Sequence, residues 1–183
     1  MVTDTFVEHM IKQKWQKGTI LKCLLIITIA FFLALILLLF AMITPFAFGV
    51  GPVSQMVTYI VTPLVAGIFY GAYRLISRFD VEYEYALTNG ELDVDKIIRK
   101  KRRSRVISID SKAFIEFGKR ADEDKSVNNK TEYARVIDAS AHSKNFEDYY
   151  AVFFKNGQKI KLYFNPTLKM IDIFKVYAPR VVK

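Results

Sequence analysis

The residues best able to do chemistry form one basic run. From Asp95 to Arg105 the chain reads DKIIRKKRRSR, and seven of the last ten residues are Lys or Arg, with no acid among them. Such a run can bind anionic lipid head groups, hold the orientation of a membrane protein, bind a partner or neutralise acids on a neighbouring strand. The residues that we expect to contact lipid are Lys96, Arg99, Lys100, Lys101, Arg102, Arg103 and Arg105.

Candidates for catalysis are few. The two histidines, His9 and His142, stand in unrelated contexts, and the single cysteine, Cys23, excludes an intramolecular disulfide and a cysteine-based zinc cluster. The chain has no GxSxG, HExxH or phosphate-loop glycine motif. We therefore expect a protein that is not an enzyme and that needs no cofactor.

Glu91, Asp93 and Asp95 raise the question of a metal site. Their alternate spacing also arises in any strand with one polar face, without an ion. We expect the strand and no metal site.

The elements that position the basic run begin with a long apolar segment. From Cys23 to Tyr73 there are 51 residues without Asp, Glu, Lys, Arg or His. A helix needs about 20 apolar residues to cross a bilayer, so the segment can hold two. We expect spans at about 21–43 and 53–76, separated by a break at TPFAFGVGP (44–52), within a transmembrane hairpin over 19–78.

Basic residues flank both expected spans, and the loop between the spans has no charge. Because Lys and Arg near spans favour the cytoplasmic side, we expect a multi-pass protein of the cell (inner) membrane with both termini cytoplasmic. Small residues at helical spacing indicate close helix packing, within the hairpin or in a homo-oligomer. These residues are Ala30, Ala34, Gly67 and Gly71.

The first 18 residues predict an amphipathic helix. Thr5 and Glu8 have capping-box spacing, and Gly18 suits the C-terminal end. Apolar residues including Met10 and Ile11 form one side. We expect this helix to lie on the membrane surface or to pack on the soluble domain.

From Asp80 the pattern alternates with a period of two, as in half-buried strands. Asn89-Gly90 predicts a hairpin turn, which sets Tyr85 opposite Val94 and Glu84 opposite Asp95. Like charges directly opposite each other are destabilising, so some of the following arginines are expected to offset them.

Further strands follow, with a second hairpin turn at Asn156-Gly157, and a C-terminal helix begins after an N-cap at Asn165. The fold class is therefore α+β. A two-helix transmembrane hairpin precedes a small antiparallel β-barrel or sandwich, capped by a helix, over 79–183. This element order is that of pleckstrin-homology-like (PH-like) domains.

Two stretches, DTFVEHMIKQK at the start and FDVEYEYALTNGELDVDKIIRKKRRSRV from Phe79, resemble an uncharacterised family of small two-span bacterial membrane proteins with a PH-like cytoplasmic domain. The resemblance covers nearly the whole chain. It implies the two-span topology and no activity.

Two functions remain open. In the first, the domain contacts anionic lipid head groups through the basic run, where each residue contributes about 1 kcal/mol near the surface. In the second, the chain is an accessory or scaffold subunit of a larger membrane complex and docks a protein partner. We expect no nucleic-acid partner, because no recognised motif accompanies the charge.

Overall fold

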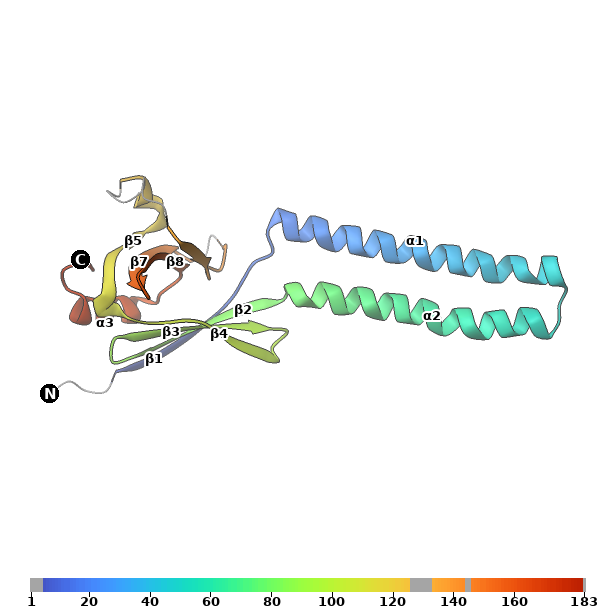
Figure 1. Cartoon of the computed structure of the whole chain (residues 1–183), viewed down its shortest axis with the longest axis horizontal. Helices are drawn as coiled ribbons and strands as arrows, with labels where there is room; N and C mark the ends of the chain where they lie inside the picture. The colour runs from blue at the N-terminus through green and yellow to red at the C-terminus, as the bar shows by residue number, and fades with distance from the viewer. Residues whose placement is uncertain (1–4, 126–132, 144–145, 183) are drawn as a thin grey trace. The chain divides into compact units, whose positions relative to one another are not determined.

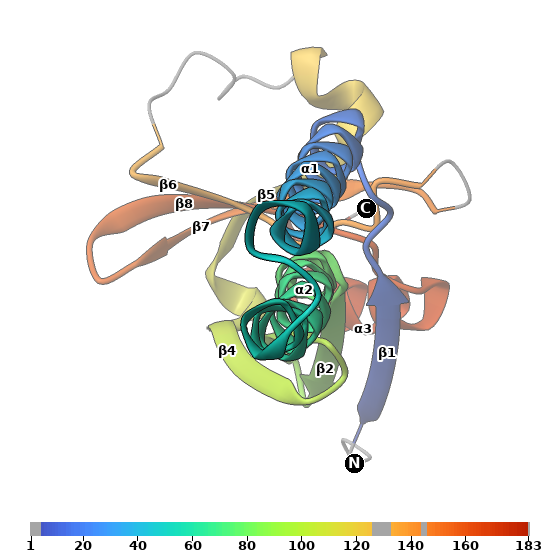
Figure 2. The same ribbon diagram turned by 90° about the vertical axis from the view of Figure 1, so that its right-hand side faces the viewer.

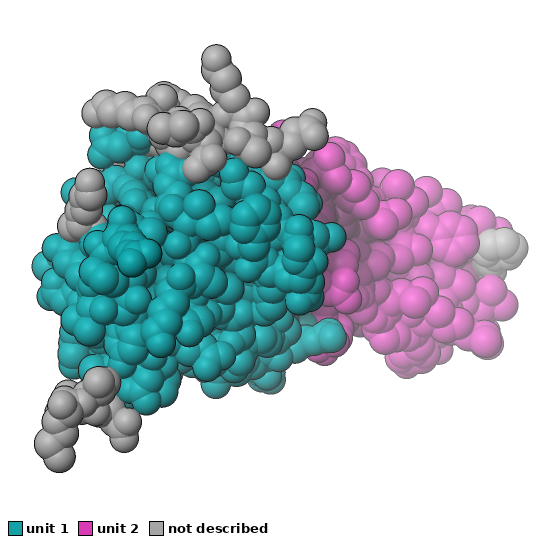
Figure 3. Space-filling model, turned by 60° about the vertical axis from the view of Figure 1, so that its left-hand side comes forward, with its two compact units in different colours: residues 1–14, 81–183 teal, residues 15–80 magenta. Residues whose placement is uncertain are grey.

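The computed structural model describes residues 5–125, 133–143 and 146–182, and its contacts divide the chain into two compact units. One unit is residues 15–80, and the other combines residues 1–14 with residues 81–183 (Figure 3). The apolar hairpin is therefore an insertion in the chain of the second unit. The expected boundary at residue 79 omits the N-terminal part of that unit.

The hairpin unit consists of two antiparallel helices that lie side by side (Figures 1 and 2), α1 (Lys17–Phe48) and α2 (Pro52–Ile76). Both helices are long and apolar enough to cross a membrane, by length and composition. α1 continues past the expected break at residue 44. Pro45 has no N–H for the Ala41 carbonyl, but the Thr44 hydroxyl donates to that carbonyl at 2.9 Å, so the helix loses little by including proline.

The second unit is built from two four-stranded sheets and a C-terminal helix. The first sheet has the order β1 (Phe6–Lys12), β2 (Val81–Thr88), β3 (Glu91–Ile98), β4 (Arg102–Asp110). The second has the order β5 (Phe114–Lys119), β7 (Tyr149–Lys155), β8 (Gln158–Phe164), β6 (Arg135–Asp138). In the described residues these sheets form a sandwich rather than a closed barrel, and β6 runs parallel to β8.

Aromatic residues fill the space between the sheets. Tyr85, Phe153 and Phe164 are fully buried, and Phe174 of α3 (Leu168–Tyr177) joins them. Edge-to-face contacts link Phe164 to Tyr85 and to Phe174, with ring centroids 5.8 and 6.2 Å apart. The helix therefore closes one core that both sheets share.

Residues 6–12 form a strand, so the expected N-terminal helix is wrong. β1 pairs antiparallel with β2 along its whole length. Val7, His9 and Ile11 are the more buried side chains, whereas Phe6 and Met10 are exposed. Burial lowers the pKa of His9, which favours the neutral ring beside Tyr85. The apolar residues fit a helical face equally well, but the open edge of β2 selects the strand.

The C-terminal helix begins two residues later than expected. The Thr167 hydroxyl, not Asn165, caps it by accepting from the Met170 amide at 3.3 Å. Asn165 is instead 2% exposed and joins three parts of the core. Its side chain donates to the Asp148 carboxylate at 2.7 Å and accepts from the Ala141 amide at 2.7 Å, and its amide donates to the Tyr85 hydroxyl at 3.4 Å.

The burial of β1 gives a first prediction. Ile11→Ala should lower the free energy of unfolding of the domain by about 3 kcal/mol, because the deleted atoms leave a core cavity. Met10→Ala, the matched change at the next residue, should cost about 0.5 kcal/mol or less, because Met10 is 52% exposed. Denaturant unfolding in mild detergent, followed by circular dichroism, measures both values. Equal losses would instead indicate an amphipathic helix with both residues on its apolar side.

Candidate functional site

The basic run occupies the β3–β4 hairpin, and the register divides it into three groups. Arg103 and Arg105 lie on the face of the first sheet that carries Glu84 and Asp95. Lys96 and Arg102 lie at the alternate positions of β3 and β4, so they belong to the opposite face of the sheet. Residues 99–101 form the turn between the strands. The run looks uniform in the sequence, but its residues lie in three different environments in the fold.

A β-bulge decides which basic residues of β4 share the acidic face. The β3–β4 register pairs Val94 with Ile107 but Asp95 with Arg105, so Val106 is an extra residue in β4. Ile107 faces the core, and regular alternation would place Arg105 on the core side as well. The bulge reverses the alternation. It thereby brings Arg105 and Arg103 onto the outer face with the acids.

The acids on that face are held by the two arginines. Arg105 Nε lies 2.7 Å from Asp95, and its Nη1 lies 3.0 Å from Asp93. Arg103 Nε lies 2.9 Å from Asp95, and its Nη2 contacts Glu84. The hydrogen bond to Asp95 raises the pKa of Arg105. The expectation that part of the basic run offsets opposed acids on neighbouring strands is confirmed at these two arginines.

These contacts are structural because they cover carboxylates that burial would otherwise penalise. The side chains of Glu84 and Asp95 are only 6% and 10% exposed, whereas the arginines above them are more than half exposed. A buried carboxylate without a partner is strongly destabilising. Arg103 and Arg105 are therefore not free to bind a ligand without cost to the fold.

The other five basic residues do not cover the buried carboxylates. Among the described residues, no acidic side chain forms an ion pair with Lys96, Arg99, Lys100, Lys101 or Arg102. Residues 100–102 are exposed, and Lys96 and Arg99 are half-buried. These five residues, which we call the free basic end, form the strongest candidate site for an anionic ligand.

The free basic end lies at a defined end of the first sheet. Ile98, the last residue of β3, pairs with Val81, and the Val81 carbonyl accepts from the Gln13 amide at 3.0 Å. Gln13 and Val81 are close to the two points at which the chain leaves for α1 and returns from α2. Only four residues, 77–80, separate the end of α2 from β2. The candidate site is therefore at the end of the sheet that is joined to the apolar hairpin.

The small residues of the hairpin fall into two groups. Ala30 and Ala34 of α1 are buried, with 5% and 3% of their surface exposed. Gly67 is exposed and Gly71 half-buried, and a Cβ at either position would meet no atom within 4 Å. The glycines therefore do not pack closely against α1. Of the two expected uses of their spacing, packing within the hairpin does not apply to them.

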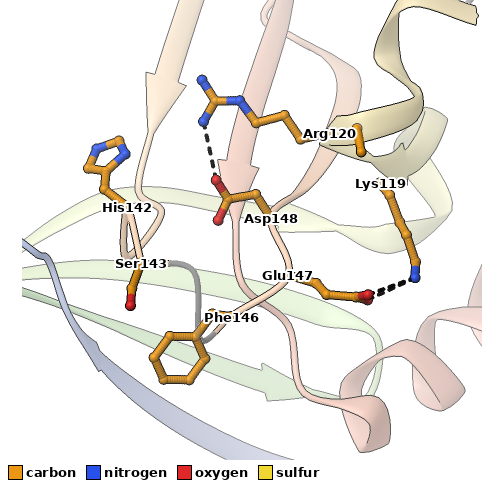
Figure 4. Close-up of a pocket in the computed structure, with 8 residues that line it drawn as sticks. Lys119, Arg120, His142, Ser143, Phe146, Glu147 and Asp148 are labelled. Carbon is orange, nitrogen blue, oxygen red and sulfur yellow. Dashed lines mark hydrogen bonds and ion pairs between the residues drawn. The ribbon is translucent and has the colours of Figure 1, made fainter.

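A second candidate is an open pocket of about 460 Å³ where β5 ends and β7 begins (Figure 4). Lys119 Nζ lies 2.9 Å from the Glu147 carboxylate, and Arg120 Nη1 lies 3.4 Å from Asp148. The Arg120 guanidinium also lies over the Tyr163 ring at 4.3 Å. Lys119 and Arg120 are thus held by neighbouring groups. This pocket consequently makes a weaker ligand site than the free basic end.

His142 also lines the pocket and lies beside Asp138 and Ser140. Its Nε2 is 3.8 Å from Asp138, and its Nδ1 is 3.3 Å from the Ser140 hydroxyl. Ser140 is fully buried and donates to Asp138 at 2.7 Å. The three residues lie within five positions of the chain, and the buried serine is not accessible as a nucleophile. Among the described residues, no group of three or more His, Cys, Asp or Glu side chains could hold a metal ion.

Comparison with known proteins identifies the class. The family model described as "Bacterial PH-like domain (DUF6106)" matches residues 3–183. The chain therefore belongs to this bacterial PH-like domain family, as the resemblance of its two stretches indicates. The match includes both β1 and the apolar hairpin. No curated protein and no solved structure gave a match.

The division of the basic run gives a second prediction. Arg105→Ala should lower the free energy of unfolding by about 2 kcal/mol, because it leaves Asp93 and Asp95 with less compensation. Lys101→Ala, which removes the same charge from the exposed turn, should change it by about 0.5 kcal/mol or less. Denaturant unfolding of the detergent-solubilised protein measures both. A larger loss for Lys101→Ala would overturn the assignment of structural and free residues.

Proposed function

We propose that the protein is a non-enzymatic, membrane-anchored positioning module whose PH-like domain contacts anionic lipid head groups through the free basic end. One observation carries this proposal. Five cationic residues without ion-pair partners among the described residues gather at the end of the sheet that continues into α1 and α2. Each such residue near an anionic surface contributes about 1 kcal/mol. The contact orients a domain that the spans already anchor.

The β1–β2 pairing supports the expected topology. α1 and α2 lie between the two strands in the sequence, yet the strands form one sheet. If both helices span the bilayer, β1 and β2 must therefore lie on the same side of it. The basic residues that flank the spans favour the cytoplasmic side of the inner membrane.

A second role is docking of a membrane protein partner, as an accessory or scaffold subunit. The uncovered glycines of α2 favour it, since Gly67 and Gly71 leave room for another helix. This role does not need the free basic end. If the folded protein does not contact lipid, docking of a protein partner becomes the better explanation of its function.

The lipid proposal predicts a specific loss of vesicle binding. Residues 79–183 alone lack β1, so the test protein joins residues 1–13 to residues 81–183 through Asn-Gly, which makes β1 and β2 a hairpin. Replacing Lys100, Lys101 and Arg102 with Gln should weaken binding to vesicles rich in phosphatidylglycerol by about 3 kcal/mol, or about 100-fold. Binding should also fall as salt is raised.

The matched control removes three charges elsewhere, through Lys112→Gln, Lys169→Gln and Lys175→Gln, which are exposed positions. This variant should retain most of the binding in co-sedimentation at low salt. Circular dichroism must show that both variants are folded. Equal weakening by the two variants, or equal binding to phosphatidylcholine vesicles, would contradict a specific contact through the free basic end.

A further inference from the structure

Three hairpin turns of the domain share a rare backbone conformation, but only two have the sequence that suits it. The β2–β3 and β7–β8 turns are Asn89-Gly90 and Asn156-Gly157, with φ values of 49° and 87°, and 52° and 75°. At the β3–β4 turn the corresponding φ values are 57° and 53°. The residues there are Arg99 and Lys100, which have full side chains.

Positive φ is disfavoured for such residues. It is seen in a few per cent of non-glycine residues, with Asn enriched, because Cβ crowds the backbone. Asn-Gly is the usual solution at a tight hairpin, and this chain uses it twice. Arg99 and Lys100 are therefore residue types that disfavour the backbone conformation of this turn. Backbone strain of this kind persists where surrounding structure imposes it, and it concentrates at functional sites.

No polar side-chain contact among the described residues compensates for this strain. The turn is closed by the Lys101 amide, which donates to the Ile98 carbonyl at 3.2 Å, a bond that Asn-Gly would permit equally. Within the part of the chain that the structure describes, the side chains of Arg99 and Lys100 form no hydrogen bond or ion pair. The hydrogen bonds and ion pairs of the described residues therefore do not require two cations at this turn.

We infer that the turn Arg99–Lys101 is a phosphate-binding element, kept strained because its ligand needs three consecutive cations at the end of a hairpin. This inference rests on the proposed function and names the group recognised there. A guanidinium binds phosphate oxygens through two parallel hydrogen bonds, and ammonium groups add point charges. A phosphate that carries two charges fits three such residues better than a singly charged phosphodiester. The ligand is thus a lipid head group with an exposed phosphate monoester.

The test uses the full chain in lipid nanodiscs. The variant Arg99→Asn with Lys100→Gly gives the turn the sequence of the other two hairpins and removes two charges. The control Lys169→Gln with Arg180→Gln removes the same charge from exposed positions elsewhere. Hydrogen exchange of residues 96–105 is compared in discs of phosphatidylcholine alone, with phosphatidylglycerol, and with phosphatidic acid at equal surface charge. A further arm adds inorganic phosphate to the neutral discs.

We expect phosphatidic acid to slow exchange in the turn at least tenfold more than phosphatidylglycerol does, in the original protein and in the control. The Asn-Gly variant should lose this difference and should unfold at a higher denaturant concentration than the original protein. Slowing by inorganic phosphate alone would mean that the element binds free phosphate, and it would overturn the lipid assignment.

Two other outcomes separate this inference from the proposed function. If all anionic discs slow exchange equally and the Asn-Gly variant keeps the effect, lipid contact stands and the phosphate element is wrong. If no anionic disc slows exchange in the original protein, the proposed function itself fails. An Asn-Gly variant that is less stable than the original protein would contradict the argument from strain.

Discussion

The structure depends on the backbone pairing between β1 and β2. The register joins Phe6 to Thr88 and Lys12 to Glu82, although the whole apolar hairpin lies between the two strands in the chain. This pairing supplies the edge strand of the first sheet and contributes Ile11 to the core. The PH-like domain is therefore complete only when the segments before and after the hairpin are together. An even number of membrane crossings is the simplest topology that meets this constraint.

The second organising feature is a single extra residue in β4. The bulge at Val106 turns Arg103 and Arg105 toward Glu84 and Asp95, and so makes part of the basic run a structural counter-charge. The remaining cations are left at the hairpin end, where they are available to a ligand. One run thereby stabilises an acidic sheet face and presents a positive end.

Local signals in the sequence predicted much of this. The Asn89-Gly90 turn fixed the β2–β3 register, and the opposition of Glu84 and Asp95 pointed to neighbouring arginines. The prediction for residues 6–12 was wrong because their apolar positions suit a helix and a strand equally well. Only the edge of β2, which is distant in the sequence, selects the strand. The position of a bulge depends on competing registers over a whole sheet, so no short sequence motif predicts it. The role of Asn165 likewise depends on residues far along the chain.

The most direct test of this account is a cross-link between β1 and β2 in isolated membranes. Glu8 and Ala86 are paired across the two strands, at a spacing suited to a disulfide. In a Cys23→Ser background, Glu8→Cys with Ala86→Cys should form a disulfide within one chain under mild oxidation. Glu8→Cys with Ser108→Cys, which are separated by two intervening strands, should not. Absence of the first cross-link, or its formation only between chains, would contradict a domain completed by its own N-terminal strand.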